Sequence, residues 1–394
     1  MQSNAKTKVA VLGLGGGGGH IAQQFVHIAE SGPFEVGVAD TDERSLNSRR
    51  GVVTIPLGEE WDCAYGCGGD MQLGEKATAA TAEALQQFIS GASLLIVTAG
   101  LGGGTGSGGL RTVAGLAREA QIPTFFLTTS PFAFEGNWRQ EQARKAVEPL
   151  RQITDSVIVV KSDLLFTTLE ADTPAVEAFR MADTLLAKCI HGLAGTIWAD
   201  WMLTADFAAI RRVLRKYPNN VHLGIGSGTG PNRWQQAIEG FVECPLVGGP
   251  DNLKNADAAV VTLLTRAQIS VGELQATLSS LQKYLPDKAQ VLVGACHSQL
   301  ASSEVQVTGI LCNGTKNDVG AEIADAKKRE NGSALESSRR FQKGDKSKTA
   351  VQGELPLQEQ ALGMFSGTRP TSVRGENLDI PTFQRRGIHI DAGD

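Results

Sequence analysis

Two glycine-rich runs, each directly after an apolar segment, constrain this chain more than any other feature. The first covers 13–19, after the apolar stretch 9–12, and the second covers 102–109, after 94–97. Glycine lets the backbone approach a phosphate and adopts positive φ freely, and successive N–H groups in such a turn bind anions. A helix that begins just beyond each run adds the positive end of its dipole. Two such turns predict one polyphosphate held from two sides.

The first run alone also suits a dinucleotide-binding protein. It fits the pattern G-x-G-x-x-G after a strand, and Asp40 lies where an acid would bind a ribose hydroxyl. The match is weak, because a run of glycines satisfies almost any glycine pattern. The second run, where Thr105 and Ser107 add hydroxyl donors, argues against a dehydrogenase, which has no need of it. Of three functional hypotheses for this chain, an NAD-dependent oxidoreductase is therefore a distant third.

Composition narrows the class of protein. The 394 residues are enough for two domains, and a hydrophobic content of 41% supports substantial cores. The net charge of −5 gives no general case for nucleic-acid binding. The polar N-terminus does not resemble a secretion signal, and no apolar stretch is long enough to span a bilayer. Only Cys63 and Cys67 lie close together among six scattered cysteines, which favours reduced cytoplasmic thiols over a zinc site.

Apolar segments alternate with helical patterns from about residue 8 to 170. The predicted strands are 8–12, 34–39, 94–98, 124–128 and 156–160, and helical patterns between them include 75–89 and 110–120. This alternation predicts a parallel sheet covered by helices. Ligands of such a sheet bind at the carboxyl ends of its strands, which is where both glycine runs lie. The first domain is therefore assigned to 1–172.

A long helix and a second domain are predicted to follow. Apolar residues cover much of the circumference of a helix over 173–202, which indicates a buried spine between two domains. A second α/β domain is predicted over 203–312, with strands at 221–225, 258–264, 290–295 and 305–311 and helices at 233–242 and 271–284.

The composition changes at about residue 313, where charged and small polar residues replace apolar ones. Such a segment buries too little apolar surface to offset the conformational entropy lost on ordering. We therefore expect a disordered linker over 313–376. A compact apolar island, Leu378–Arg386, then appears in the last segment, 377–394. An island of this kind after a disordered tether is typical of a docking peptide.

Five segments together resemble the FtsZ family of bacterial, tubulin-like cell-division GTPases, over nearly the whole chain. They are Asp40–Asp42, Ala99–Gly108 (similar to the family's glycine-rich signature loop), Pro131–Gly136, Glu177–Asp183 and Leu378–Phe383. The resemblance implies an α/β fold of the tubulin/FtsZ type. Its parts are a Rossmann-like GTP-binding domain, a long central helix, a second α/β domain and a disordered tail.

The resemblance also implies a site for GTP or GDP, with Mg²⁺ held through the nucleotide and not by protein ligands. It assigns to the phosphates Gly16, Gly17, Gly18, Gly19, His20, Gly104, Thr105 and Gly106, with Gly68 and Gly69 near the γ-phosphate. Glu135 is expected to accept hydrogen bonds from the ribose, and Arg139 to neutralise phosphate charge. Phe179 is expected to stack on the base. Asp183 is expected to accept from guanine N1–H and the amino group.

The chain departs from the family pattern at functional positions. Asp40 and His20 stand where the family has Asn, and Ser162 replaces the Asn on the guanine side. In the family, two acids after the central helix reach the nucleotide of the next subunit. Here Asp206 keeps the first acid and Ala209 removes the second. A positioned acid or base typically raises the reaction rate ~10²–10⁴-fold. We therefore expect GTP binding with slow hydrolysis through Asp206.

The resemblance implies that copies of this chain assemble head to tail into filaments for cell division at midcell. It also implies a membrane adaptor of the FtsA or ZipA type, contacted by Leu378, Ile380, Pro381, Phe383 and Arg385. Nucleic-acid binding and direct membrane insertion are not expected. The alternative is a structural or regulatory filament that uses nucleotide to assemble but barely hydrolyses it.

Overall fold

The structure is a computed structural model, and it describes most of the chain up to residue 314. A compact unit spans Met1–Val319, and a second unit spans Gly320–Asp394. The described residues are 8–29, 32–58, 65–154, 157–167, 169–170, 172–198, 200–203, 207–217, 221–297, 304–314, 372–373 and 376–377.

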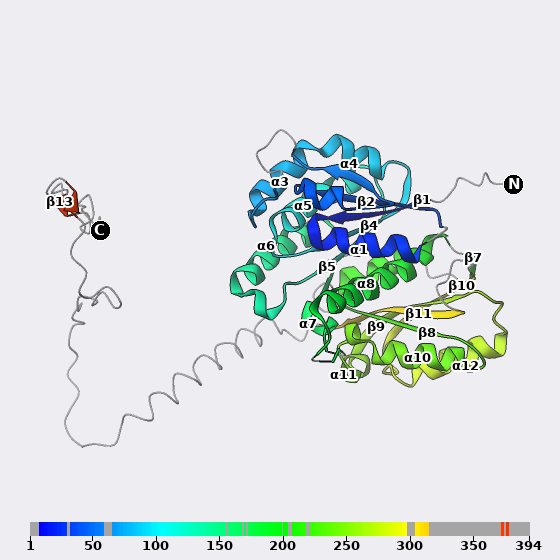
Figure 1. Cartoon of the computed structure of the whole chain (residues 1–394). Coiled ribbons are helices and arrows are strands. Elements are labelled where there is room, and N and C mark those ends of the chain that lie inside the picture. The colour runs from blue at the N-terminus through cyan, green and yellow to red at the C-terminus, as the bar shows by residue number, and fades with distance from the viewer. Residues whose placement is uncertain are drawn as a thin grey trace, which may run out of the picture. The chain divides into compact units, whose positions relative to one another are not determined.

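A six-stranded parallel sheet forms the first half of the compact unit (Figure 1). Its order is β3-β2-β1-β4-β5-β6, with β1 (Lys8–Leu14), β2 (Phe34–Asp40), β3 (Val53–Pro56), β4 (Ala92–Gly100), β5 (Thr124–Thr129) and β6 (Val157–Val160). Five of these strands confirm the predictions. The sequence did not reveal β3, because this short edge strand has only one buried residue, Ile55.

Helices cover both faces of this sheet. Successive residues of a strand point to opposite faces, and in these strands the residues on both faces are apolar. Val9 and Val11 of β1 pack in one cluster with Phe25 of α1 (Gly15–Ile28). Ala10 and Leu12 pack in another with α3 (Met71–Ala80), α4 (Ala82–Ile89), α5 (Gly104–Glu119) and α6 (Asn137–Ile153). Short elements in the connections are α2 (Glu43–Asn47), η1 (Ala133–Glu135) and α7 (Ser162–Leu165). The predicted α/β class is confirmed.

The long helix α8 (Ala175–Trp198) lies between the two sheets of the compact unit (Figure 1). Leu186 and Ile190 are fully buried there, as a spine requires. Two details of the prediction were wrong. The first turns are not buried, since Val176 is 84% exposed. The helix also ends before residue 202, because Asp200–Leu203 forms β7 and pairs with β10.

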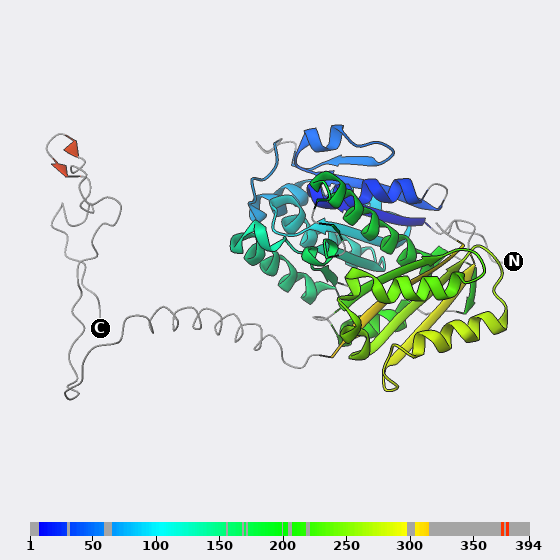
Figure 2. The same cartoon turned by 60° about the horizontal axis from the view of Figure 1, so that its bottom comes forward.

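A five-stranded mixed sheet, ordered β7-β10-β9-β11-β8, forms the second half. Its other strands are β8 (Val221–Gly228), β9 (Ala256–Thr265), β10 (Gln290–His297) and β11 (Val305–Asn313), all close to the predicted ranges. Helices α10 (Arg233–Glu243) and α12 (Val271–Gln282) cover the face away from α8 (Figure 2). Three short helices complete this half: α9 (Phe207–Lys216), η2 (Pro245–Val247) and α11 (Pro250–Lys254).

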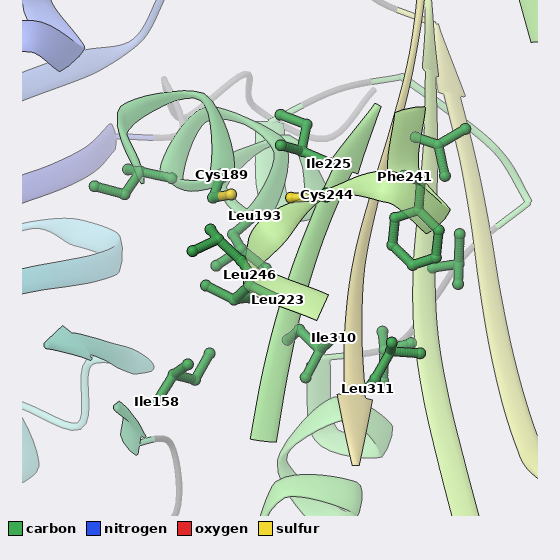
Figure 3. Packing of buried hydrophobic residues seen from close by; sticks show 14 of the residues in the cluster. Ile158, Cys189, Leu193, Leu223, Ile225, Phe241, Cys244, Leu246, Ile310 and Leu311 are labelled. Carbon is green, nitrogen blue, oxygen red and sulfur yellow. The ribbon is translucent and has the colours of Figure 1, made fainter. Parts of the chain in front are cut away.

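The apolar core runs without a break from α8 into the second sheet. Figure 3 shows Cys189 of α8 and Cys244, at the end of α10, with their sulfur atoms facing one another among Leu193, Leu223 and Leu246. Burial raises the pKa of both thiols, Cys189 most strongly. These cysteines therefore act as apolar packing residues.

In the C-terminal unit the described residues form one antiparallel pair, β12 (Ser372–Val373) with β13 (Glu376–Asn377). This pair falls mostly within the segment predicted as a disordered linker. The predicted docking segment from Leu378 onward lies outside the described residues. Within the described part of the chain, no helix combines the length and the apolar character of a membrane span.

Candidate functional site

A cavity of about 310 Å³ lies at the carboxyl edge of the first sheet. One wall consists of two glycine turns: the first glycine turn, Gly15–Gly17, follows β1, and the second, Gly103–Gly106, follows β4. The other wall carries Phe132, Ser162, Phe179 and Asp183. The volume is at the lower end of the range for small-molecule sites.

Helices α1 and α5 begin inside the glycine runs, at Gly15 and Gly104. Neither helix has a side-chain cap on its first N–H groups. The first N–H groups of a helix have no partner within it, so two uncapped helix starts point at one cavity. This arrangement suits an anion with several charges.

Not every predicted glycine lines the cavity. Gly16, Gly17, Gly104, Thr105 and Gly106 do so. Gly18 and Gly19 lie one turn further along α1, outside the lining, where they let the helix approach the sheet. A Cβ on Gly18 would overlap the carbonyl oxygen of Thr98, and one on Gly19 would lie 2.8 Å from a methyl group of Val38.

An aromatic cluster shapes the opposite wall. Phe179 is 44% exposed, and its ring meets the rings of Phe132 and Phe166 edge-on, with centroids 5.6 and 5.3 Å away. The neighbouring Phe134, 73% exposed, stacks on Phe132. Edge-on packing at one side of the Phe179 ring leaves an apolar surface at the cavity, which suits a planar ring.

Glu135 and Arg139 both line the cavity, but they bind each other. An Nη1 hydrogen of Arg139 is donated to Oε2 of Glu135 over 2.6 Å. The other carboxylate oxygen of Glu135 accepts from the backbone N–H of Phe132. The two side chains predicted for the ribose and the phosphates therefore form one ion pair at the wall of the cavity.

Asp183 lines the cavity on the same face of α8 as Phe179. Burial raises the pKa of Asp183 to about 7, and the positive charge of Arg49 opposes that rise. A carboxylate with few water contacts accepts hydrogen bonds strongly. Asp183 can therefore select a ligand that presents N–H donors.

His20 stands outside the cavity lining, on the turn of α1 after the first glycine turn. Its Nδ1 lies 3.3 Å from Nη1 of Arg49. Loss of water around the ring and the charge of Arg49 lower the pKa of His20. Sequence reasoning missed Arg49, a residue only 8% exposed and 29 positions from its histidine partner.

The predicted γ-phosphate loop lies beside the second glycine turn. Gly68 and Gly69 have φ of 55° and 89°, and neither lines the cavity. Within the same loop, Cys67 is in hydrogen-bonding range of two hydroxyls, those of Thr41 (3.4 Å) and Thr105 (3.7 Å). The two hydroxyls lie 2.7 Å apart. This thiol–hydroxyl network, which was not predicted, joins the loop to the second glycine turn.

Two further predicted positions complete the site. Ser162 lines the cavity, buried, with its hydroxyl donated to the carbonyl oxygen of Ser130. Ala209 lies in the first turn of α9. Asp206 lies outside the described residues.

Comparisons with known proteins identify relatives of this chain. Residues 8–170 match the model of the Tubulin/FtsZ family, GTPase domain, and residues 220–315 match that of the FtsZ family, C-terminal domain. The cell division protein FtsZ of Azotobacter vinelandii is 28% identical over 382 residues, which cover 96% of each chain. The cell division protein FtsZ of Pseudomonas putida is 28% identical over 391 residues, covering 98% of this chain and 90% of the relative.

Solved structures show the same fold. An empty FtsZ dimer from M. jannaschii superposes with a TM-score of 0.67 at 26% identity, covering 79% of this chain and 89% of that one. CetZ2 from Haloferax volcanii, solved as a GTPγS-bound protofilament, gives a TM-score of 0.64 at 22% identity, covering 84% and 100%. The matched family models are those of GTPases of the Tubulin/FtsZ family and of FtsZ.

Proposed function

Because this chain belongs to the tubulin/FtsZ family of cell-division GTPases, we propose that its cavity binds GTP and GDP between the two glycine turns. The observation that carries this proposal is the meeting of two uncapped helix starts, those of α1 and α5, at one cavity. The N–H groups of Gly16, Gly17 and Gly104–Gly106 suit the phosphates. Mg²⁺ would be held through the nucleotide and not by protein side chains, and it would neutralise phosphate charge there.

The base lies against the aromatic wall in this proposal. Phe179 offers the stacking surface, and Asp183 accepts from N1–H and the amino group of guanine. Adenine has no N–H at N1, so it cannot satisfy both carboxylate oxygens. A site built to hydrogen-bond one group rejects an analogue that lacks it, because its buried polar atoms lose their partners.

Before Glu135 and Arg139 can bind the sugar and the phosphates, the ion pair between them must break, or the two side chains must bind the nucleotide together. The ion pair joins side chains that are 24% and 51% exposed. Exposed pairs contribute only about 0–1 kcal/mol, so the nucleotide can replace the contact at little cost. Glu135 then accepts from the ribose hydroxyls, and Arg139 turns to phosphate charge.

Hydrolysis is slow in this proposal. Phosphoryl transfer depends on positioning and on charge stabilisation, and one acid of the proposed composite site is replaced by Ala209. Asp206 remains to position the attacking water on the nucleotide of the next subunit. The second candidate function, a filament that assembles on nucleotide and barely hydrolyses it, rests on the same substitution.

Head-to-tail stacking of copies supplies the composite site and generates open filaments, because such a contact does not close on itself. The test is sedimentation of the full chain with Mg²⁺ and GTP, GDP or ATP, followed by negative-stain microscopy. We expect pelletable filaments with GTP. A monomer at every concentration with GTP would contradict the filament proposal.

The terminal segment supplies the link to the membrane in this proposal. Leu378, Ile380 and Phe383 form an apolar side, Pro381 shapes the peptide, and Arg385 adds charge. Basic residues near an anionic membrane contribute only about 1 kcal/mol each. A membrane-bound adaptor protein of the FtsA or ZipA type is therefore the proposed partner.

A further inference from the structure

A thiol and two hydroxyls meet at the second glycine turn, and the proposed nucleotide contacts use only one of the three groups. Thr105 lines the cavity, and its Oγ1 lies 2.7 Å from Oγ1 of Thr41. Sγ of Cys67 lies 3.4 Å from the Thr41 hydroxyl and 3.7 Å from the Thr105 hydroxyl. All three residues are buried, so the direction of each hydrogen bond matters, because water does not readily replace a lost partner.

Neighbouring contacts hold this thiol–hydroxyl network in place. The side chain of Asp40, the last residue of β2, accepts from the backbone N–H of Thr41 over 2.8 Å. Cys67 lies against the start of α5, because a Cβ on Gly104 would be 2.5 Å from the Cβ of Cys67. Thr105 follows Gly104 in the first turn of that helix. The network therefore joins three segments that are far apart in the sequence.

The number of hydrogens gives this network a direction. Each of the two hydroxyls and the thiol carries one hydrogen. At the contact between Thr105 and Cys67, the hydroxyl of Thr105 is the donor. The other two contacts are then both filled only if Cys67 donates to Thr41 and Thr41 donates to Thr105. The network is thus a closed ring in which every hydrogen has an acceptor.

A phosphate against Thr105 would open this ring at its longest contact. An ionised phosphate oxygen only accepts hydrogen bonds, so the Thr105 hydroxyl must turn its hydrogen towards it. The contact given up is the one with Cys67, at 3.7 Å the longest of the three. The other two keep their direction, so the thiol donates to Thr41, Thr41 to Thr105, and Thr105 to the phosphate. Hydrogen bonds that follow one another in this way polarise and strengthen each other.

We propose that Thr41 and Cys67 are positioning residues for phosphate binding: they donate in sequence to Thr105 and so direct its hydroxyl hydrogen to the nucleotide. This inference rests on the proposed guanine-nucleotide site, in which the second glycine turn binds phosphates. Thr41 and Cys67 do not line the cavity, so each acts through Thr105. Thr41 has the larger effect, because it contacts Thr105 directly and because a thiol is a weak donor.

The first measurement is GTP affinity, by calorimetry of the full chain with Mg²⁺. Thr41→Val keeps the shape of the side chain and removes the hydroxyl, and Thr41→Ser keeps the hydroxyl. We expect Thr41→Val to lose GTP affinity about tenfold and Cys67→Ala about threefold, as for weakened hydrogen bonds. Thr41→Ser should bind GTP as the wild type does. Unchanged affinity in Thr41→Val, or a loss in Thr41→Ser as large as in Thr41→Val, would overturn the proposal.

Two further measurements separate positioning from simple loss of packing. If Thr41 acts through the Thr105 hydroxyl, Thr41→Val should cause no further loss of GTP affinity in a Thr105→Val background, whereas independent effects would add. Guanosine, which has no phosphate, should compete for the site equally well in the wild type and in Thr41→Val. Additive losses of GTP affinity, or a loss of guanosine binding equal to that of GTP, would contradict the proposal.

The matched controls are Thr277→Val and Cys296→Ala, in the second half of the compact unit. Thr277 of α12 is 3% exposed, against 2% for Thr41, and its hydroxyl donates to the carbonyl oxygen of Glu273. Cys296 of β10 is also buried, with Sγ 3.7 Å from the carbonyl oxygen of Leu263. Both controls should bind GTP as the wild type does, and losses equal to those of the test variants would refute this inference. Wild-type protein that fails to bind GTP would instead refute the proposed function.

Discussion

Gly15 and Gly106 bring the two glycine turns into contact, since a Cβ on Gly15 would lie 2.9 Å from the amide nitrogen of Gly106. Gly15 also has φ of 66°, a conformation that other residues avoid. These two glycines therefore make two helix starts into one wall of the cavity. Any side chain on Gly15 would separate the turns.

Gly15→Ala should destabilise the protein and abolish nucleotide binding. The left-handed conformation alone costs roughly 1–2 kcal/mol for a residue with a Cβ, and the overlap with Gly106 adds to that cost. Gly115→Ala is the control, because a Cβ there meets nothing within 4 Å. Because Gly115 lies inside helix α5, the alanine variant should stabilise the protein by roughly 0.5–1 kcal/mol. Thermal unfolding with and without GTP measures both effects, and equal melting temperatures would contradict the account.

The raised pKa of Asp183 predicts a pH-dependent stability. Burial raises this pKa from 3.8 to about 7, so the folded protein holds a proton that the unfolded chain has released. Stability from this group is therefore full below pH 3.8 and is lost as the pH rises towards 7. Asp183→Asn removes the titration. Urea unfolding of both proteins from pH 5 to 8 should show the variant gaining relative stability with pH, and a constant difference would be inconsistent with a buried acid.

Much of the fold could be predicted, because its parallel strands are nearly continuous apolar runs. Such runs, like 94–98, predict strands without knowledge of their neighbours. The end of α8 could not be predicted, since Trp201–Leu203 continues the apolar pattern of the helix but pairs with β10. Tertiary pairing there overrides a local pattern.

The site could be predicted only in part, because a local sequence pattern does not show which residues meet in space. A run of five glycines, 15–19, cannot show from sequence which members face a ligand and which pack on the sheet. Glu135 and Arg139 are four residues apart, a spacing that predicts an ion pair on a helix. Arg49 gave no signal, because its contact with His20 exists only once β1, β2 and their helices have folded together.

Hydrolysis should respond to restoring the second acid. Ala209→Asp is expected to raise GTP turnover by roughly 10²-fold, the lower end for a positioned acid or base. Ala208→Asp adds the same charge one residue away and should leave turnover unchanged. Phosphate release is measured against protein concentration, because a composite site works only when subunits touch. Equal rates for both variants would reject the role given to position 209.

The terminal segment should matter for placement and not for assembly. A chain lacking residues 378–394 should bind GTP and form filaments as the full chain does, but fail to localise at midcell. A chain with 378–386 scrambled controls for length and composition. If the truncated protein still forms rings at midcell, this segment is not the membrane link.

The most direct test of the central claim is calorimetric binding of GTP and of ATP to the full chain at pH 8 with Mg²⁺. Both nucleotides offer the same phosphates to the glycine turns, so only the base distinguishes them. We expect GTP to bind at least tenfold more tightly, about 1.4 kcal/mol, because Asp183 finds two N–H donors on guanine alone. Equal affinities, or no binding of GTP, would contradict a guanine-nucleotide site in this cavity.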